Sequence, residues 1–307
     1  MENFISLFPD NRAEGETVLR QAQLVMLRNL KIVDYICNKH NIKYWLDGGT
    51  LLGAVRHGGF IPWDDDLDIS MIREDYNKFI EAAKKELPDD LFLQLTETDP
   101  EYDMPWLKIR DNNSEVIEYK SGNYHKGLFI DVFPMDYYGI SIEEVNKKKK
   151  AYKLRYRLMM LIKEPFEKII SPKIFIKNIV KLICKAVFLT YTLQDKSALF
   201  SELRERRDAA IASSRGEEQK VIGYGPEVIF WNNYFNKEDI FPIRKFKFED
   251  GEFNVPNNYH KYLTDMFGNY MELPPEKDRI PHNLSLNPIL NKPGEVYYDK
   301  NTSYCSQ

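Results

Sequence analysis

The sequence predicts an α+β fold with a basic helical insertion, on three observations. In some segments apolar residues recur at helical spacing, and short apolar or alternating segments typical of strands lie between them. From Lys147 to Lys185 the chain has thirteen basic and two acidic residues, although its formal net charge is −4. The 307 residues, 43% of them hydrophobic, are enough for one large domain, or for a core with an appended subdomain.

Two helices and several strands are predicted in order along the chain. Residues 16–40 and 74–87 place apolar side chains on one side of a helix, and Pro88 ends the second helix. Apolar or alternating segments predict strands at 42–46, 66–69, 91–95, 106–110 and 127–134, and a hairpin at 245–256 that turns at Asp250-Gly251.

Two carboxylates in the 66–69 segment predict a cation site. In a strand, alternation places Asp66 and Asp68 on one face, where they repel each other unless a cation such as Mg²⁺ lies between them. An alternative is a calcium loop of the EF-hand type, because Asp64, Asp66 and Asp68 have its spacing. Ile69 opposes that alternative, since it occupies the position where such a loop needs glycine.

Gly48, Gly49 and Thr50 predict a phosphate-binding turn at the start of a helix. Glycines let the backbone approach a ligand closely, and N–H groups at a helix N-terminus attract anions. Arg56 and His57 would add positive charge a little further along. The alternative is a plain turn without a ligand.

The stretch around these residues strongly resembles the LicD family of phosphotransferases, which is related to the fukutin-related ribitol-phosphate transferases. The similar residues are WLDGGTLLGAVR at 45–56 and GFIPWDDDLD at 59–68. The resemblance covers about 15–140 and 240–285. It implies a nucleotidyltransferase-like mixed sheet flanked by helices, with an Asp-x-Asp pair and a third carboxylate on a later strand.

Asp131 is the candidate for that third carboxylate, as a metal ligand or as a base. It lies inside an apolar strand, where a charge is costly unless it is paired or metal-bound. The alternative is a salt bridge to a core cation, and Asp136 is a weaker candidate. Lys108 and Arg110 share a strand face and would neutralise a diphosphate, or else mark an exposed basic edge strand.

The C-terminal region adds further candidates through the resemblance. Tyr262, Asp265, Tyr270 and His282 are expected near the donor or acceptor, with the alternative that the histidine is structural. We predict a catalytic core at 1–140, a basic helical insertion at 141–220, and a C-terminal region at 221–307 that completes the active site.

Within the insertion, lysines recur every four residues at Lys173, Lys177, Lys181 and Lys185. This pattern predicts peripheral contact of 147–187 with an anionic membrane, and a helical subdomain with solvated lysines is the alternative. No apolar run is long enough to span a bilayer.

Together these features predict a Mg (or Mn)-dependent phosphotransferase. It would move a phospho-alcohol, with phosphocholine as first choice, from a CDP-linked donor to a free or lipid-linked cell-surface glycan such as teichoic acid, capsule or lipopolysaccharide, releasing CMP. The alternatives are a nucleotidyltransferase that attacks the α-phosphorus of an NTP, and a non-catalytic metal- or glycan-binding module.

Composition narrows the partners and the compartment. The net charge of −4 does not predict nucleic-acid binding. The three cysteines have no metal-ligand spacing, which indicates a reducing compartment and no structural zinc. Without an evident secretory signal, we expect a cytoplasmic protein that is peripheral on the inner face of the cell membrane.

Overall fold

The computed structural model describes residues 4–102, 104–118, 123–138, 150, 172–187, 205, 220–225, 227–228, 231–290 and 295–296. Seven described strands form the central sheet, and only the pair β2–β6 is parallel. The main path of the sheet is β1 (Trp45–Leu46), β2 (Asp68–Ile72), β6 (Phe129–Tyr138), β4 (Leu107–Asp111) and β3 (Leu91–Gln94). β7 (Val221–Tyr224) pairs with the far half of β6, and β8 (Tyr234–Asn236) pairs with β7.

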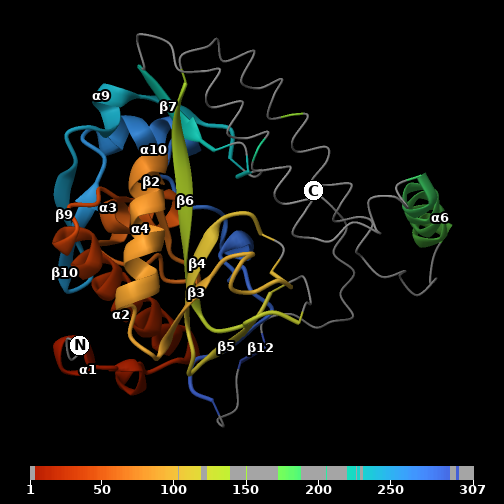
Figure 1. The fold of residues 1–307 in the computed structure, drawn as a ribbon, viewed down its shortest axis with the longest axis horizontal. Coiled ribbons are helices and arrows are strands. Elements are labelled where there is room, and N and C mark those ends of the chain that lie inside the picture. The colour runs from red at the N-terminus through yellow and green to blue at the C-terminus, as the bar shows by residue number, and fades with distance from the viewer. Residues whose placement is uncertain are drawn as a thin grey trace.

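Helices α2 (Val18–Lys39), α3 (Gly48–His57) and α4 (Arg73–Glu86) gather beside this sheet, as Figure 1 shows. The buried residues of α4 recur at helical spacing, because this helix packs one apolar face on the core, whereas α2 is buried on all sides from Val25 to Leu30. The fold is therefore mixed α+β, with a curled mixed sheet flanked by helices, and this confirms the predicted nucleotidyltransferase-like class.

The smaller elements extend the edges of this body. Among the described residues, the remaining helices and 3-10 turns are α1 (Phe4–Leu7), η1 (Arg12–Glu14), α6 (Pro172–Val187), α9 (Lys237–Ile240), α10 (Tyr259–Phe267) and η2 (Glu276–Asp278). The remaining strands are the hairpin β9 (Arg244–Phe248) with β10 (Gly251–Val255), and the small sheet of β5 (Glu115–Ile117), β11 (Ser285–Asn287) and β12 (Glu295–Val296).

The predicted elements overlap the observed ones, but several bounds differ. The strand predicted at 42–46 is only Trp45–Leu46, and the one predicted at 127–134 is Phe129–Tyr138. The strand predicted at 66–69 begins only at Asp68, so Asp66 lies in the preceding loop. The hairpin turn lies at Glu249-Asp250, one residue earlier than predicted, and Glu249 has a positive φ of 56°. The alternative of an exposed edge strand at 106–110 is wrong, because β4 lies between β6 and β3.

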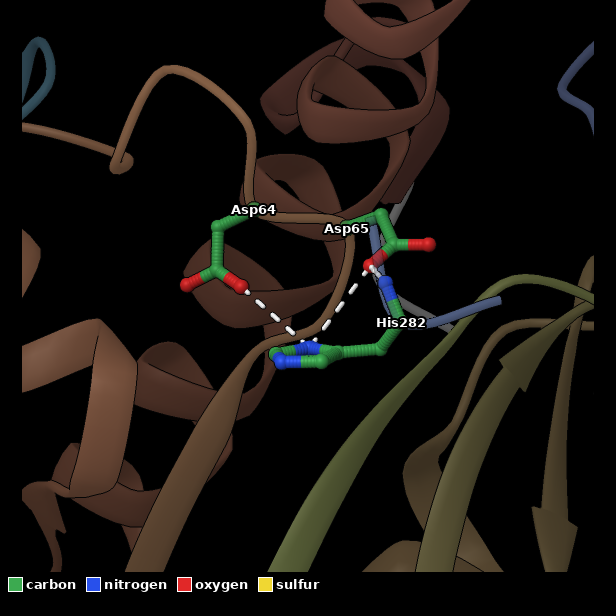
Figure 2. A group of neighbouring side chains, drawn as sticks. All are labelled: Asp64, Asp65 and His282. Atoms are coloured by element: carbon green, nitrogen blue, oxygen red, sulfur yellow. Dashed lines mark hydrogen bonds and ion pairs between the residues drawn. The ribbon is translucent and has the colours of Figure 1, made fainter. Parts of the chain in front are cut away.

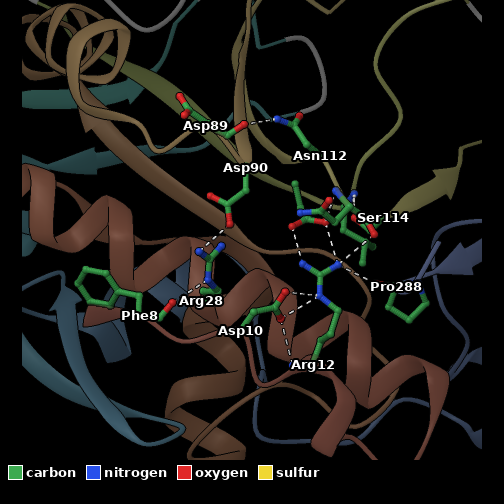
Figure 3. A network of polar contacts seen from close by, with 12 residues as sticks. Phe8, Asp10, Arg12, Arg28, Asp89, Asp90, Asn112, Ser114 and Pro288 are labelled. Atoms are coloured by element: carbon green, nitrogen blue, oxygen red, sulfur yellow. Dashed lines mark hydrogen bonds and ion pairs between the residues drawn. The ribbon is translucent and has the colours of Figure 1, made fainter. Parts of the chain in front are cut away.

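Buried arginines fasten the N-terminal segment to the rest of the fold (Figure 3). The guanidinium of Arg12 donates to both carboxylate oxygens of Asp111, at 2.6 and 3.0 Å, and to the carbonyl of Pro288 at 2.7 Å. Arg28 lies 2.7 Å from the Asp90 carboxylate and donates to the carbonyl of Phe8. Because the buried charges of Arg12 and Asp111 satisfy each other, they hold the first residues against the end of β4, and the bond to Pro288 joins them to the residues after β11.

The division into 1–140, 141–220 and 221–307 stays a prediction. Much of 141–220 lies outside the described residues. The third part is joined closely to the first, since β7 extends the sheet from β6 and β11 pairs with β5.

Candidate active site

Two strand-borne carboxylates lie side by side at one end of the parallel pair. Asp68 opens β2 and is directly opposite Asp131 of β6 in the register, and both residues are less than a tenth exposed. Burial raises the pKa of Asp68 well above its usual range, and the charges of Asp66 and Asp131 raise it further. Such neighbours favour a bound cation or proton, because two buried carboxylates repel each other.

The N-terminus of α3 lies against these carboxylates because two glycines leave room for them. Gly48 has a φ of +51°, and a Cβ there would lie 2.8 Å from Oδ2 of Asp68. A Cβ on Gly49 would lie 2.9 Å from Oδ2 of Asp64. The Thr50 hydroxyl accepts the backbone N–H of Asp68 at 2.8 Å. Gly48, Gly49 and Thr50 thus form the first turn of a helix, and phosphate binding there stays a prediction.

The loop before β2 divides its three aspartates between two tasks. Asp65 accepts the backbone N–H groups of His282 and Asn283, at 2.6 and 2.9 Å, and the Asn283 side-chain amide at 2.9 Å. Asp64 and Asp66 face the His282 imidazole, whose Nδ1 lies 3.5 and 3.3 Å from their oxygens and 3.7 Å from Asp65. Asp65 therefore fixes the C-terminal segment that presents the histidine.

His282 lies between carboxylates, and Figure 2 shows its imidazole directed at Asp64 and Asp65. The hydrogen bond and charge of Asp66 raise the pKa of His282 to about 9. Burial raises the pKa of Asp66, but the hydrogen bond and charge of His282 outweigh it and lower that pKa overall. The structure thus brings His282 to the acidic cluster, from a position more than two hundred residues away in the chain.

The cluster suits a hard divalent cation. Asp64, Asp66, Asp68 and Asp131 offer carboxylate oxygens, the ligands that Mg²⁺ and Mn²⁺ prefer. Among the described residues, Asp64, Asp65 and His282 also form a group whose ligand atoms lie within 4.8 Å of one another. Because Asp65 already accepts three N–H bonds, Asp64 is the better ligand of the two aspartates.

Asp131 has a salt bridge as well as its acidic neighbour. Its Oδ2 lies 3.1 Å from the Lys108 ammonium, and its Oδ1 accepts the indole N–H of Trp106 at 2.7 Å. Burial raises the pKa of Asp131, while the charge of Lys108 opposes burial without overcoming it. Asp131 thus has the partner that the salt-bridge alternative required, and it also lies where the third carboxylate was expected. Asp136 instead pairs with Arg73.

Lys108 and Arg110 share the expected face, but both have partners inside the protein. Lys108 contacts Asp131 and Glu118, and its ammonium lies 3.2 Å from the centre of the Phe129 ring. Arg110 is fully buried and donates to Gln94, the carbonyl of Gly127 and Glu118. Lys108 therefore lies beside the acidic site. Arg110 has no direct bond to that site in the described structure and shares the partner Glu118 with Lys108.

The other predicted positive charges lie at the opposite end of α3. Arg56 and His57 form its last turn, and Arg56 donates to the carbonyls of Tyr270 and Glu272. The Tyr270 hydroxyl bonds to His260, and Asp265 pairs with Lys261 on the surface of α10. Asp265 and Tyr270 thus bond to neighbours on or near α10, and contact with a donor stays a prediction for Arg56, His57, Asp265 and Tyr270.

Sequence reasoning missed the most deeply buried carboxylate near the site. Asp47, the N-cap of α3, is fully buried and accepts Gly48 N–H at 2.8 Å, the Tyr224 hydroxyl at 2.7 Å and the Tyr262 hydroxyl at 2.8 Å. The Ser70 hydroxyl donates to it as well. The signal was an aspartate directly before a Gly-Gly helix start, which is a common N-cap pattern. Tyr262 is thus buried against Asp47, and its role at the donor or acceptor stays a prediction.

Comparison with known proteins gives a consistent family assignment. A family model described as the nucleotidyltransferase domain of LicD/FKTN/FKRP matches residues 41–169. The chain is 31% identical to the lipopolysaccharide cholinephosphotransferase LicD of Haemophilus influenzae over 89% of this chain and 98% of that protein. It is also 31% identical to the human ribitol 5-phosphate transferase FKRP over 93 residues, which are 30% of this chain and 17% of that protein. An uncharacterised protein of Rickettsia prowazekii is 50% identical over 64 residues, 21% of this chain and 22% of that protein.

Proposed function

Because this chain belongs to the LicD family and is a phosphotransferase, we propose that it transfers a phospho-alcohol from a CDP-linked donor to a hydroxyl group of a cell-surface glycan, releasing CMP. Phosphocholine is the first choice of phospho-alcohol, since the relative similar over nearly its whole length is named as a cholinephosphotransferase. Lipopolysaccharide, teichoic acid or capsule would supply the acceptor, either free or lipid-linked. The free thiols of Cys37 and Cys184 support a reducing, cytoplasmic compartment.

The observation on which this proposal depends is the meeting of a helix N-terminus with buried carboxylates. The first turn of α3 lies against Asp64 and Asp68, and Asp131 lies beside Asp68. Amides of a first helical turn have no partner four residues earlier within the helix and attract phosphate oxygens. Carboxylates that would repel a phosphate are tolerable beside it only with a cation between them.

Asp64, Asp66, Asp68 and Asp131 would hold a Mg²⁺ or Mn²⁺ ion. When bound, the metal would neutralise charge on the diphosphate and on the leaving CMP. The residues of the chain do the remaining work. The α3 amides orient a phosphate, and the Asp131 carboxylate accepts the proton of the attacking glycan hydroxyl. Burial of Asp131 raises its pKa, which makes it a stronger base, and the Lys108 ammonium keeps it oriented.

Nucleotide release by the purified chain tests the proposal. With Mg²⁺ and a crude cell-surface glycan, we expect CMP from one of CDP-choline, CDP-ribitol or CDP-glycerol, and no pyrophosphate from CTP. Asp68→Asn should reduce turnover at least a hundredfold while the circular dichroism spectrum stays unchanged. Asp278→Asn, an exposed aspartate far along the chain, is the matched control and should retain activity.

Three outcomes would contradict the proposal. Pyrophosphate from CTP would make the protein a nucleotidyltransferase proper. Binding of nucleotide or glycan without turnover of any donor would make it a binding module. Full activity of Asp68→Asn would remove the acidic cluster from the mechanism.

A further inference from the structure

Helix α6 differs from an ordinary surface helix because its large apolar side chains are exposed, while part of its polar side is covered. Its lysines recur every four residues and so form one side of the helix. The less exposed side chains of α6 belong to this polar side: Ile174, Asn178, Lys181, Cys184 and Lys185. Lys181 is only 1% exposed. The lysine-bearing side of α6 is therefore covered around Lys181 and Lys185, whereas Lys173 and Lys177 near its start are exposed.

The opposite side is apolar and exposed. It has six large side chains that are 40% to 60% exposed: Phe175, Ile176, Ile179, Val180, Leu182 and Ile183. An amphipathic helix on a globular protein normally packs this side on the core, because exposed apolar surface is costly in water. A contiguous apolar surface of this kind marks a contact with an apolar partner.

Charge indicates which partner this is. The segment from Lys147 to Lys185 has thirteen basic and two acidic residues in a chain with a net charge of −4. A second copy of the chain would bring two such cationic segments together, and they would repel each other. An anionic bilayer attracts them and also offers hydrocarbon to the apolar side.

The length of α6 fits a helix that lies along the bilayer. In the described part of the chain no helix is long and apolar enough to span a membrane, and α6 has 16 residues. We propose that α6 inserts its apolar side into the boundary between headgroups and acyl chains of an anionic membrane, while Lys173 and Lys177, which are exposed, contact the headgroups. The sequence predicted a basic amphipathic helix at an anionic membrane surface, and the structure adds that the apolar side of this helix is exposed.

Sedimentation of the full-length chain with vesicles tests this proposal. We expect binding to vesicles of phosphatidylcholine with a third phosphatidylglycerol, weak binding to phosphatidylcholine alone, and weaker binding at high salt. Ile176→Asn/Ile183→Asn should lower the partition coefficient at least tenfold. The matched control is Leu7→Asn/Leu290→Asn, which changes exposed apolar side chains elsewhere and should bind as the wild type does.

A fluorescent reporter within α6 separates insertion from simple electrostatic attraction. In Phe175→Trp, the tryptophan emission should shift to the blue when anionic vesicles are added, because the new indole enters an apolar environment. The proposal is wrong if the wild-type chain stays in the supernatant with anionic vesicles, or if the double variant binds them equally well. It is also wrong if the apolar side holds two copies together, so that the double variant is monomeric and the wild type a dimer that binds no vesicles.

Discussion

Replacing Tyr262 by phenylalanine should destabilise the protein by removing one hydrogen bond from a buried carboxylate. The Tyr262 hydroxyl donates to Asp47 at 2.8 Å and accepts the indole N–H of Trp45 at 3.3 Å. The ring itself stacks on Phe235 with centroids 3.8 Å apart, and a phenyl ring keeps that contact. A hydrogen bond to a charged group contributes about 1.5–3 kcal/mol, so we expect the free energy of unfolding to fall by that amount.

Urea unfolding followed by circular dichroism measures this loss as a lower midpoint with an unchanged slope. Tyr224→Phe removes the other tyrosine donor to Asp47 and should cost a similar amount. Tyr259→Phe, on the same helix as Tyr262 and half-exposed, is the matched control and should change stability by less than about 0.5 kcal/mol. If Tyr262→Phe is as mild as this control, the Asp47 network does not stabilise the fold as we infer.

Three further predictions concern acid stability, packing and metal binding. Burial raises the pKa of Glu118, but the two basic side chains of β4 outweigh burial and bring it to about 2, against an ordinary 4.5. Its ion pairs therefore contribute about 3 kcal/mol to the free energy of unfolding above pH 4.5, and this contribution is lost as the pH falls towards 2. In urea unfolding at a series of pH values, the stability of Glu118→Gln should fall less steeply over this range than that of the wild type. An equally steep fall in both proteins would refute the prediction. Gly59→Ala should lower the unfolding midpoint, because a Cβ at this position would lie 2.3 Å from Oε1 of Glu249. The loss should largely vanish when the same substitution is made in Glu249→Ala. Equal losses in the wild-type and Glu249→Ala backgrounds would contradict this reasoning. Mg²⁺ at a hundred times the wild-type dissociation constant should stabilise the wild type by about 2.7 kcal/mol in thermal unfolding. If Asp68→Asn gains a similar amount at the same Mg²⁺ concentration, Asp68 is not a ligand.

The strands that carry the site could be predicted from the sequence, but the tertiary contacts of their side chains could not. Asp131 was recognisable because a charge inside an apolar strand needs a partner, and its position opposite Asp68 confirms the expected neighbour. The start of β2 was predicted two residues early, since alternation alone does not distinguish the end of a loop from the start of a strand. Asp66 reaches the cluster from that loop.

The contacts that sequence reasoning missed join side chains to partners outside their own elements, and two of them join residues more than two hundred positions apart. Asp65 looks like its acidic neighbours in the sequence, yet it holds the backbone at His282, and Asp47 binds the hydroxyl of Tyr262. Arg110 was expected to face a ligand, but Glu118 and Gln94 enclose it. Local spacing contains no information about such partners, because tertiary packing selects them.

The pairing of β6 with β7 has a consequence for how this protein family can diversify. Tyr138 at the end of β6 is directly opposite Val221 at the start of β7, so residues 139–220 leave and rejoin the sheet at neighbouring positions. The entropic cost of closing a loop grows only with the logarithm of its length. Residues 139–220 could therefore be lengthened, shortened or exchanged during evolution while the strands of the site keep their register. The same phosphotransferase core would then act at different places in the cell.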